Sequence, residues 1–174
     1  MLIKQDKQPK IPKSISAKEG DVLEITTEKG FAYVQYTHYH PECGELIRVL
    51  QGFYETPLTS EEIEVFTELE YRFSLFICWD YCVAQKGIHF TSNFPISSDG
   101  KNFPIFKKTD ALIGQVWNEP NHVIWRLWDG KKEWEVGPLN EEQRKKHPEI
   151  ILCSSEASLF YYIETGQSLG EDLY

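Results

Sequence analysis

A series of three short apolar and aromatic runs near the N-terminus constrains the fold of this chain more than any other feature. Residues 22–25 form a β-rich run, and residues 31–38 alternate between two faces, so that Tyr36 and His38 are predicted to share one of them. A third run covers residues 46–50. Because Tyr and β-branched residues favour strands and the intervening segments are short and polar, these runs predict a three-stranded antiparallel meander.

A hairpin is predicted further along the chain, in residues 123–136. Asp129 and Gly130 suit the two central positions of a type I′ turn. In that register Trp125 pairs with Trp134 on one face of the hairpin. The remaining predicted pairs are Trp128 with Lys131, Leu127 with Lys132, Arg126 with Glu133, and Val123 with Val136.

Residues 71–79 predict one more strand, apolar on much of both faces and therefore central in a sheet. Short helices are expected around the strands. Thr59 with Glu62 and Asn140 with Gln143 form capping boxes, and residues 155–165, followed by a glycine, predict a terminal helix. The expected fold class is α+β and mainly antiparallel β, an SH3-like or partly open β-barrel with short peripheral helices and a C-terminal helix.

The length of 174 residues suits one domain with a sizeable core. Residues 1–17 contain two prolines and scattered lysines, which favour a flexible basic arm over a helix. Residues 18–174 are expected to form a single globular β-rich domain. The hydrophobic content of 41%, with 14% aromatic residues, indicates a folded chain.

The charge of the chain is strongly negative and unevenly distributed. The formal net charge is −9, with +3 over residues 1–20 and −12 over the rest. This balance argues against general nucleic-acid binding, which requires clustered Lys and Arg. No apolar run is long enough to span a membrane, and the N-terminus lacks the apolar centre of a signal peptide. We therefore expect a cytoplasmic protein, with its four sparse cysteines as free thiols and Cys78 and Cys82 in the core.

The sharpest local constellation for chemistry is His38-x-His40-x-x-Cys43, because imidazoles and a thiolate at a strand end can ligate zinc. The sequence favours the alternative that these are turn and strand-end side chains, since no CxxC or HxxxH supplies further ligands, and no metal site is assigned. No GxSxG, P-loop or GxGxxG motif is present, so no cofactor and no catalytic residue is assigned. For titratable residues such as Asp80 and His89, a solvated or structural role is a simpler explanation than acid–base catalysis.

Two segments resemble a known family. Residues 18–25 read KEGDVLEI and residues 30–36 read GFAYVQY. They are similar to the N-terminal signature of the bacterial immunity protein 26 family, which has Gly-Asp, an apolar strand with a turn, and a Gly-x-Ala-Tyr-like second strand. The likeness covers mainly residues 18–50, with a looser likeness over residues 125–137. This chain has Thr26 where the family usually has Pro, and its basic arm is an addition.

The resemblance implies a non-enzymatic cytoplasmic protein that binds and neutralises a bacterial polymorphic toxin. The acidic body would suit a basic toxin, because opposite charge raises association rates. A candidate face combines aromatic and histidine side chains of the meander with the Trp128 side of the hairpin. The candidate binding residues are Asp21, Glu24, Tyr33, Tyr36, His38 and Trp128.

Other functions stay open at this point. One is a metal-assisted hydrolase that uses His38, His40 and Cys43 or a carboxylate, or an uncharacterised small-molecule-binding domain. Another is a scaffold protein without a toxin partner, and a homodimer is also an open arrangement.

Overall fold

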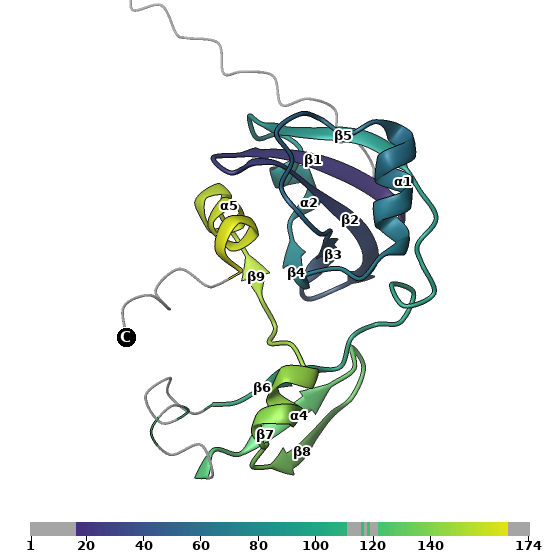
Figure 1. Ribbon diagram of the computed structural model, residues 1–174. Coiled ribbons are helices and arrows are strands. Elements are labelled where there is room, and N and C mark those ends of the chain that lie inside the picture. Colours follow the sequence, from purple (N-terminus) through teal and green to yellow (C-terminus); the bar gives the residue numbers. More distant parts are fainter. Residues whose placement is uncertain (1–16, 111–115, 117, 119–121, 167–174) are drawn as a thin grey trace, which may run out of the picture.

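The computed structural model describes residues 17–110, 116, 118 and 122–166 (Figure 1). The predicted arm of residues 1–17 lies outside this range apart from Ala17. The α+β class is confirmed, because mostly antiparallel strands form a six-stranded and a three-stranded sheet with short helices around them. Both sheets are open in the described part of the chain, and no closed barrel forms.

The large sheet consists of β1 (Asp21–Thr27), β2 (Gly30–His40), β3 (Gly44–Val49), β4 (Phe73–Ile77), β5 (Ile88–Asn93) and β9 (Leu152–Cys153). The small sheet consists of β6 (Phe106–Lys108), β7 (Trp125–Trp128) and β8 (Glu133–Gly137). The strand orders are β5-β1-β2-β3-β4-β9 and β6-β7-β8. The helices are α1 (Ser60–Glu68), α2 (Trp79–Cys82), α4 (Glu141–Lys146) and α5 (Glu156–Thr165).

The predicted meander is confirmed as β1, β2 and β3, which pair antiparallel in that order. The capping boxes are confirmed too. Thr59 caps α1 with Glu62, and Asn140 caps α4 with Gln143. Gly166 ends α5 with a φ of 76°, a left-handed conformation that glycine adopts without steric cost.

A β-bulge in β2 changes which side chains share a face. Tyr36 pairs with Ile47, but His38 pairs with Leu46, so Thr37 is the extra residue. Because cross-strand partners lie on the same face of a sheet, the bulge separates Tyr36 from His38. The prediction that these two side chains share a face was therefore wrong, since strict alternation holds only where no residue is inserted.

The two faces of the large sheet are covered by different helices, with α1 and α5 on opposite sides of it (Figure 1). The face that carries Tyr36 packs against Trp79 of α2 and against Leu159 and Ile163 of α5. The other face carries Tyr33, which clusters with Ile63 of α1. Helices on both faces explain why the central strands carry buried apolar side chains on both faces.

An aromatic cluster joins the two sheets. Leu46 and Phe76 of the large sheet pack against Phe106 of β6, with Phe103 and Trp128 around them. The ring centroids of Phe76 and Phe106 are 5.6 Å apart, and those of Phe103 and Trp128 are 5.6 Å apart in an edge-to-face arrangement. Such pairs add specific geometry to the burial of apolar area.

The predicted two-residue turn between β7 and β8 was wrong. Trp128 pairs with Glu133, so the loop has four residues, 129–132. Asp129 Oδ1 accepts hydrogen bonds at 2.9 and 2.7 Å from the backbone N–H groups of the two lysines that follow Gly130. A type I′ turn needs a positive φ at both central residues, and among the described residues only glycines have one.

The longer loop shifts the partners of the hairpin. Leu127, not Trp125, pairs with Trp134, and Trp134 is 39% exposed whereas Trp125 is buried. The expected contact between Arg126 and Glu133 still forms, with Arg126 Nε 2.9 Å from a Glu133 carboxylate oxygen. It is a diagonal contact in the observed register.

Arg48 of β3 is a charged side chain that is only 1% exposed. Its guanidinium donates hydrogen bonds to Gln35 Oε1 at 2.9 Å, to Ser97 Oγ at 2.7 Å and to the backbone carbonyl of Thr67. Burial lowers its pKa. These bonds connect β2, β3, the end of α1 and the loop after β5.

We expect Arg48→Lys to lower the free energy of unfolding by about 3 kcal/mol, because one ammonium cannot reproduce the planar set of donors and leaves buried acceptors unpaired. Urea denaturation monitored by Trp fluorescence measures this loss. Arg144→Lys is the control and should change stability by less than about 0.5 kcal/mol. Equal effects of the two substitutions would contradict this role for Arg48.

All four cysteines are free, and two of them lie in the core. The core position predicted for Cys82 is correct, and Cys153 joins it. Cys78 was expected there but is exposed, because β4 ends at Ile77 and α2 begins directly afterwards. Burial raises the pKa of both Cys82 and Cys153 to about 12, from a usual value of 9.0.

Stability should therefore fall in alkali. Above pH 9 the unfolded chain releases these thiol protons while the folded chain keeps them, so each thiol costs about 1–1.5 kcal/mol of stability by pH 10. Urea denaturation between about pH 8 and 10 measures the slope. Cys82→Ala with Cys153→Ala should flatten it and Cys78→Ser should not; the same slope in all three proteins would disprove the assignment.

Candidate functional site

The two histidines of the proposed zinc motif lie in a cleft between the sheets, with a volume of about 580 Å³. His38 and His40 come from the end of β2, and the opposite wall is the β7–β8 loop at Asp129 and Gly130. Lys101 and Phe103, from the segment between β5 and β6, also line this cleft. The bulge in β2 is what turns both imidazoles towards the small sheet.

Main-chain carbonyls engage both imidazoles. His38 Nε2 is 3.1 Å from the carbonyl oxygen of Lys101, and His40 Nε2 is 3.0 Å from that of Gly130. A carbonyl oxygen only accepts hydrogen bonds, so Nε2 carries the proton in each ring. Nδ1 of His40 accepts from the backbone N–H of Glu42 at 3.3 Å, whereas Nδ1 of His38 is buried without a hydrogen-bond partner. The rings thus fasten the loops at the cleft.

The imidazole of His40 also contacts the hairpin. It meets Trp128 edge to face, with ring centroids 4.8 Å apart. The histidine end of β2 and the Trp128 side of the hairpin, which the predicted face combined, are therefore close to each other. His40 contacts Trp128 directly, and Phe103 contacts both His38 and Trp128.

The proposed zinc ligands do not form one set. Cys43 lines a different pocket from the one that holds the histidines. Among the described residues, no group of three or more His, Cys, Asp or Glu side chains is arranged to hold a metal ion. Burial, and then the charge of Glu42, raise the pKa of the Cys43 thiol, which disfavours the thiolate that zinc binds.

The remaining predicted site residues have structural partners. Asp21 is buried and accepts hydrogen bonds from the backbone N–H of Lys18 at 2.9 Å and from Asn93 at 2.8 Å. The hydroxyl of Tyr33 donates to Glu24 at 2.7 Å, and burial is the main cause that raises its pKa. These bonds fix the start and the middle of β1.

Tyr33 and Tyr36 are both buried, and they lie on opposite faces of the sheet. Tyr36 packs against Trp79 with ring centroids 5.5 Å apart. Of the six predicted binding residues, Tyr33 and Glu24 contact each other through a structural hydrogen bond, and His38 and Trp128 both contact the ring of Phe103. Core packing explains the tyrosines.

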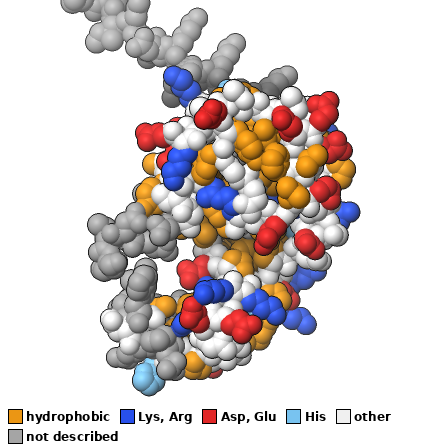
Figure 2. All heavy atoms as spheres, viewed as in Figure 1, with side chains coloured by type: hydrophobic (Ala, Val, Ile, Leu, Met, Phe, Trp, Pro, Cys, Tyr) orange, Lys and Arg blue, Asp and Glu red, His pale blue; other side chains and the backbone are white. Residues whose placement is uncertain are grey.

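An acidic face on α1 is a candidate that the sequence analysis did not single out. Residues 49–71 contain six Glu and no Lys, Arg or His, and all six carboxylates are exposed: Glu55, Glu61, Glu62, Glu64, Glu68 and Glu70. Within the described residues, no ion pair joins any of them to a cation. In Figure 2 red acidic side chains gather over α1, beside an orange hydrophobic area.

The charges of α1 repel one another. Glu64 lies three residues from Glu61 and four from Glu68, spacings at which like charges destabilise a helix. Two of the carboxylates have local partners, because Glu62 completes the capping box and Glu68 favours the charged form of Arg48. Glu64 has no such partner among the described residues.

Helix α4 shows the opposite design in the same chain. Its first turn is acidic, its last turn is basic, and Glu141 pairs with Lys145 at 2.6 Å. This arrangement complements the helix dipole, whereas α1 has no basic residue in its last turn. Self-repulsion on α1 is therefore a feature of that helix and not of the whole protein.

Apolar side chains interrupt the acidic face. Val65 is 61% exposed and Leu69 is 48% exposed, whereas Ile63 and Thr67 point into the protein. Helical spacing places Val65 on the same outer side as Glu61 and Glu68, which lie four residues before it and three residues after it. An apolar centre with a charged rim is the usual arrangement of a protein-binding patch. The sequence signal that could have revealed this acidic face is the absence of Lys, Arg and His over residues 49–71.

No family model, no curated protein and no solved structure matches this chain. The resemblance to an immunity protein family therefore rests on the residues 18–50 quoted above. None of the described helices has the length and hydrophobicity that a membrane crossing requires.

We expect Glu64→Lys to raise the free energy of unfolding by about 0.5–1 kcal/mol, because two repulsive pairs on α1 become attractive. Thermal and urea denaturation at low ionic strength measure the gain, which should shrink in high salt. Glu142→Lys on α4 is the matched control and should give no gain. A loss of stability in the Glu64 variant would contradict the proposed repulsion.

Proposed function

We propose that this chain is a binding protein whose α1 face engages a basic protein, and that the partner is a bacterial toxin which it neutralises. The single observation that carries the binding function is the exposed, cation-free face of α1, with Val65 at its centre. A helix that keeps mutually repelling charges loses stability, and such losses are typical of functional surfaces. A cationic partner would relieve the repulsion.

Charge supports a basic partner in two ways. Opposite charge accelerates association, and the six carboxylates lie within one segment and not across the whole surface. Burial of Val65 and Leu69 would add apolar contact at the centre of the same patch. The toxin as the class of partner comes from the resemblance of residues 18–50 to the immunity protein 26 family.

The state of the histidines also favours binding over acid–base chemistry. His38 and His40 donate from Nε2 to main-chain carbonyls, and this arrangement positions loops. A second candidate function is a small-molecule-binding domain, favoured by the 580 Å³ cleft between the sheets.

The test begins with the full chain immobilised at low salt in a lysate of its native cells. The main bound protein is identified, purified and used as the probe in binding kinetics. Glu61→Gln with Glu64→Gln should slow its association about tenfold at low salt, and less at high salt. Glu62 and Glu68 stay unchanged because they have structural roles.

The matched control removes two exposed carboxylates elsewhere, with Glu28→Gln and Glu142→Gln. It has the same net charge as the α1 variant and should associate at close to the wild-type rate. Equal slowing by both variants would mean that net charge alone sets the association rate. No slowing by either variant would exclude the α1 face as the binding surface. An acidic captured protein would also contradict the proposal.

Neutralisation needs a separate readout. Expression of the purified partner's gene should stop cell growth, and co-expression of this chain should restore it. The Glu61 and Glu64 double variant should restore growth less well than the control variant at equal protein levels. A partner without toxicity would refute the toxin assignment but leave the binding face intact.

A further inference from the structure

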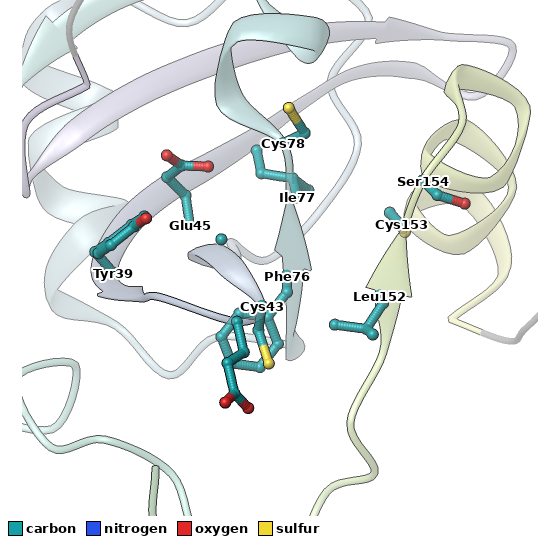
Figure 3. A pocket seen from close by; sticks show the side chains of 11 residues that line it. Tyr39, Cys43, Glu45, Phe76, Ile77, Cys78, Leu152, Cys153 and Ser154 are labelled. Atoms are coloured by element: carbon teal, nitrogen blue, oxygen red, sulfur yellow. The ribbon is translucent and has the colours of Figure 1, made fainter. Parts of the chain in front are cut away.

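A second pocket, of about 380 Å³, lies at the end of the large sheet where β3 begins and β4 and β9 end (Figure 3). In Figure 3 Tyr39 and Glu45 lie on one side of it, and Leu152, Cys153 and Ser154 on the other. Tyr39 also lines the cleft with the histidines, but the strand ends belong neither to that cleft nor to the acidic face of α1. The proposed function leaves this pocket without a role.

The backbone shapes the pocket. Glu45 pairs with Ile77, and Ile77 pairs with Cys153, so three strand ends are in register. Gly44 precedes them with a φ of 87°, and a Cβ there would lie 2.6 Å from the carbonyl oxygen of Ile77. Only glycine fits this approach, so the wall stays free of a side chain at that point.

The lining of the pocket includes large hydrophobic side chains that are exposed to solvent. Tyr39 is 59% exposed and Leu152 is 58% exposed, although both are large hydrophobic side chains. Phe76 and Ile77 lie behind them and are buried. A ligand with an aliphatic portion would cover this exposed apolar surface.

The charge of the pocket is negative. Glu42 and Glu45 are among its lining residues, and none of the lining residues is Lys, Arg or His. Glu45 is held in place because one of its carboxylate oxygens accepts the backbone N–H of Trp79 at 2.9 Å. The charge of Lys108 lowers the pKa of the Cys43 thiol, whereas that of Glu42 raises it. The ammonium of Lys108 already pairs with Glu133.

We propose that this pocket binds an organic cation, a guanidinium or ammonium group on an aliphatic chain, with the charge beside Glu45 and the chain against Leu152 and Tyr39. A cation is attracted both by the carboxylates and by the face of an aromatic ring. Long aliphatic stems of basic groups pack on apolar surface while the charged end stays polar. An anion would be repelled, and a neutral chain would cover Glu45 without compensating its charge.

This chemistry has two natural sources: a free amine or guanidine, and an Arg or Lys side chain of another protein. The proposal does not depend on the α1 face, because no α1 residue lines the pocket. Failure of one leaves the other standing.

The pocket contains its own reporter, Cys78, which is exposed and lines it. Cys82 and Cys153 react slowly with alkylating agents, because burial raises the pKa of both thiols to about 12. Cys43 also lines the pocket, so peptide-level mass spectrometry after brief iodoacetamide treatment of the full chain is used to obtain the labelling rate of Cys78 separately. An occupant of the pocket should lower that rate.

The probes are butylguanidinium and its neutral near-isostere butylurea, each titrated into the millimolar range. Butylguanidinium should slow the labelling of Cys78 at least threefold and saturably, and should shift the methyl NMR signals of Leu152. Butylurea should do neither at the same concentrations. Equal effects of the two probes, or no effect of butylguanidinium, would overturn the proposal.

Glu45→Gln keeps an acceptor for the Trp79 N–H and removes the charge, and should weaken butylguanidinium binding about tenfold. If that variant fails to fold, Glu42→Gln, at an exposed position, should weaken binding in the same direction. Glu28→Gln is the control and should bind as the wild type does. Unchanged affinity in both pocket variants would overturn the proposal.

A third probe distinguishes the sources. The blocked tripeptide acetyl-Gly-Arg-Gly-amide carries the same side chain on a peptide backbone. Protection of Cys78 by this peptide at least as strong as by butylguanidinium assigns the pocket to a protein's basic side chain. Protection by butylguanidinium alone assigns it to a free amine or guanidine.

Discussion

The buried guanidinium of Arg48 organises one face of the large sheet. Removing this charge from water is costly, and the protein offsets the cost with hydrogen bonds to β2, to the end of α1 and to the loop after β5. Gly100 sits so close that a Cβ there would lie 2.7 Å from an Arg48 nitrogen. The positions of α1 and of the segment that leads to the small sheet therefore depend on satisfying one side chain.

The inter-sheet cleft depends in turn on the bulge at Thr37. Without the extra residue, His38 and His40 would point to the face that α2 and α5 cover. With it, His40 contacts the small sheet and its loop through Trp128 and Gly130, and His38 binds the main-chain carbonyl of Lys101 in the segment before β6. Aromatic packing of Phe76 against Phe106 and Trp128 then holds the two sheets together. These contacts give the two histidines a structural role in forming the cleft.

Charge is used in contrasting ways on the surface. The helix α4 pairs its charges and complements its dipole, while no ion pair joins the carboxylates of α1 to a cation among the described residues. The pocket beside Glu45 also has carboxylates next to exposed apolar side chains. Both surfaces combine negative charge with uncovered hydrophobic groups, which is the complement of basic side chains with aliphatic stems.

Local rules in the sequence determined the elements. The meander, the capping boxes at Thr59 and Asn140 and the glycine that ends α5 depend on neighbouring residues only, and each is present. The hairpin shows the limit of such rules. The side chain of Asp129 binds the backbone of its own loop, and this four-residue turn displaces the two-residue turn that Asp-Gly favours.

Only the tertiary structure decided which side chains are available for function. Alternation along β2 does not reveal a bulge, because the inserted residue is defined by pairing with β3. Burial of Tyr33 and Tyr36 required covers on both faces, which α1 and the pair of α2 and α5 supply from distant parts of the chain. By itself the sequence determined the periodicity, the caps and the cation-free segment of residues 49–71. The cleft and the pocket exist only after long-range packing, because each is lined by residues far apart in the chain.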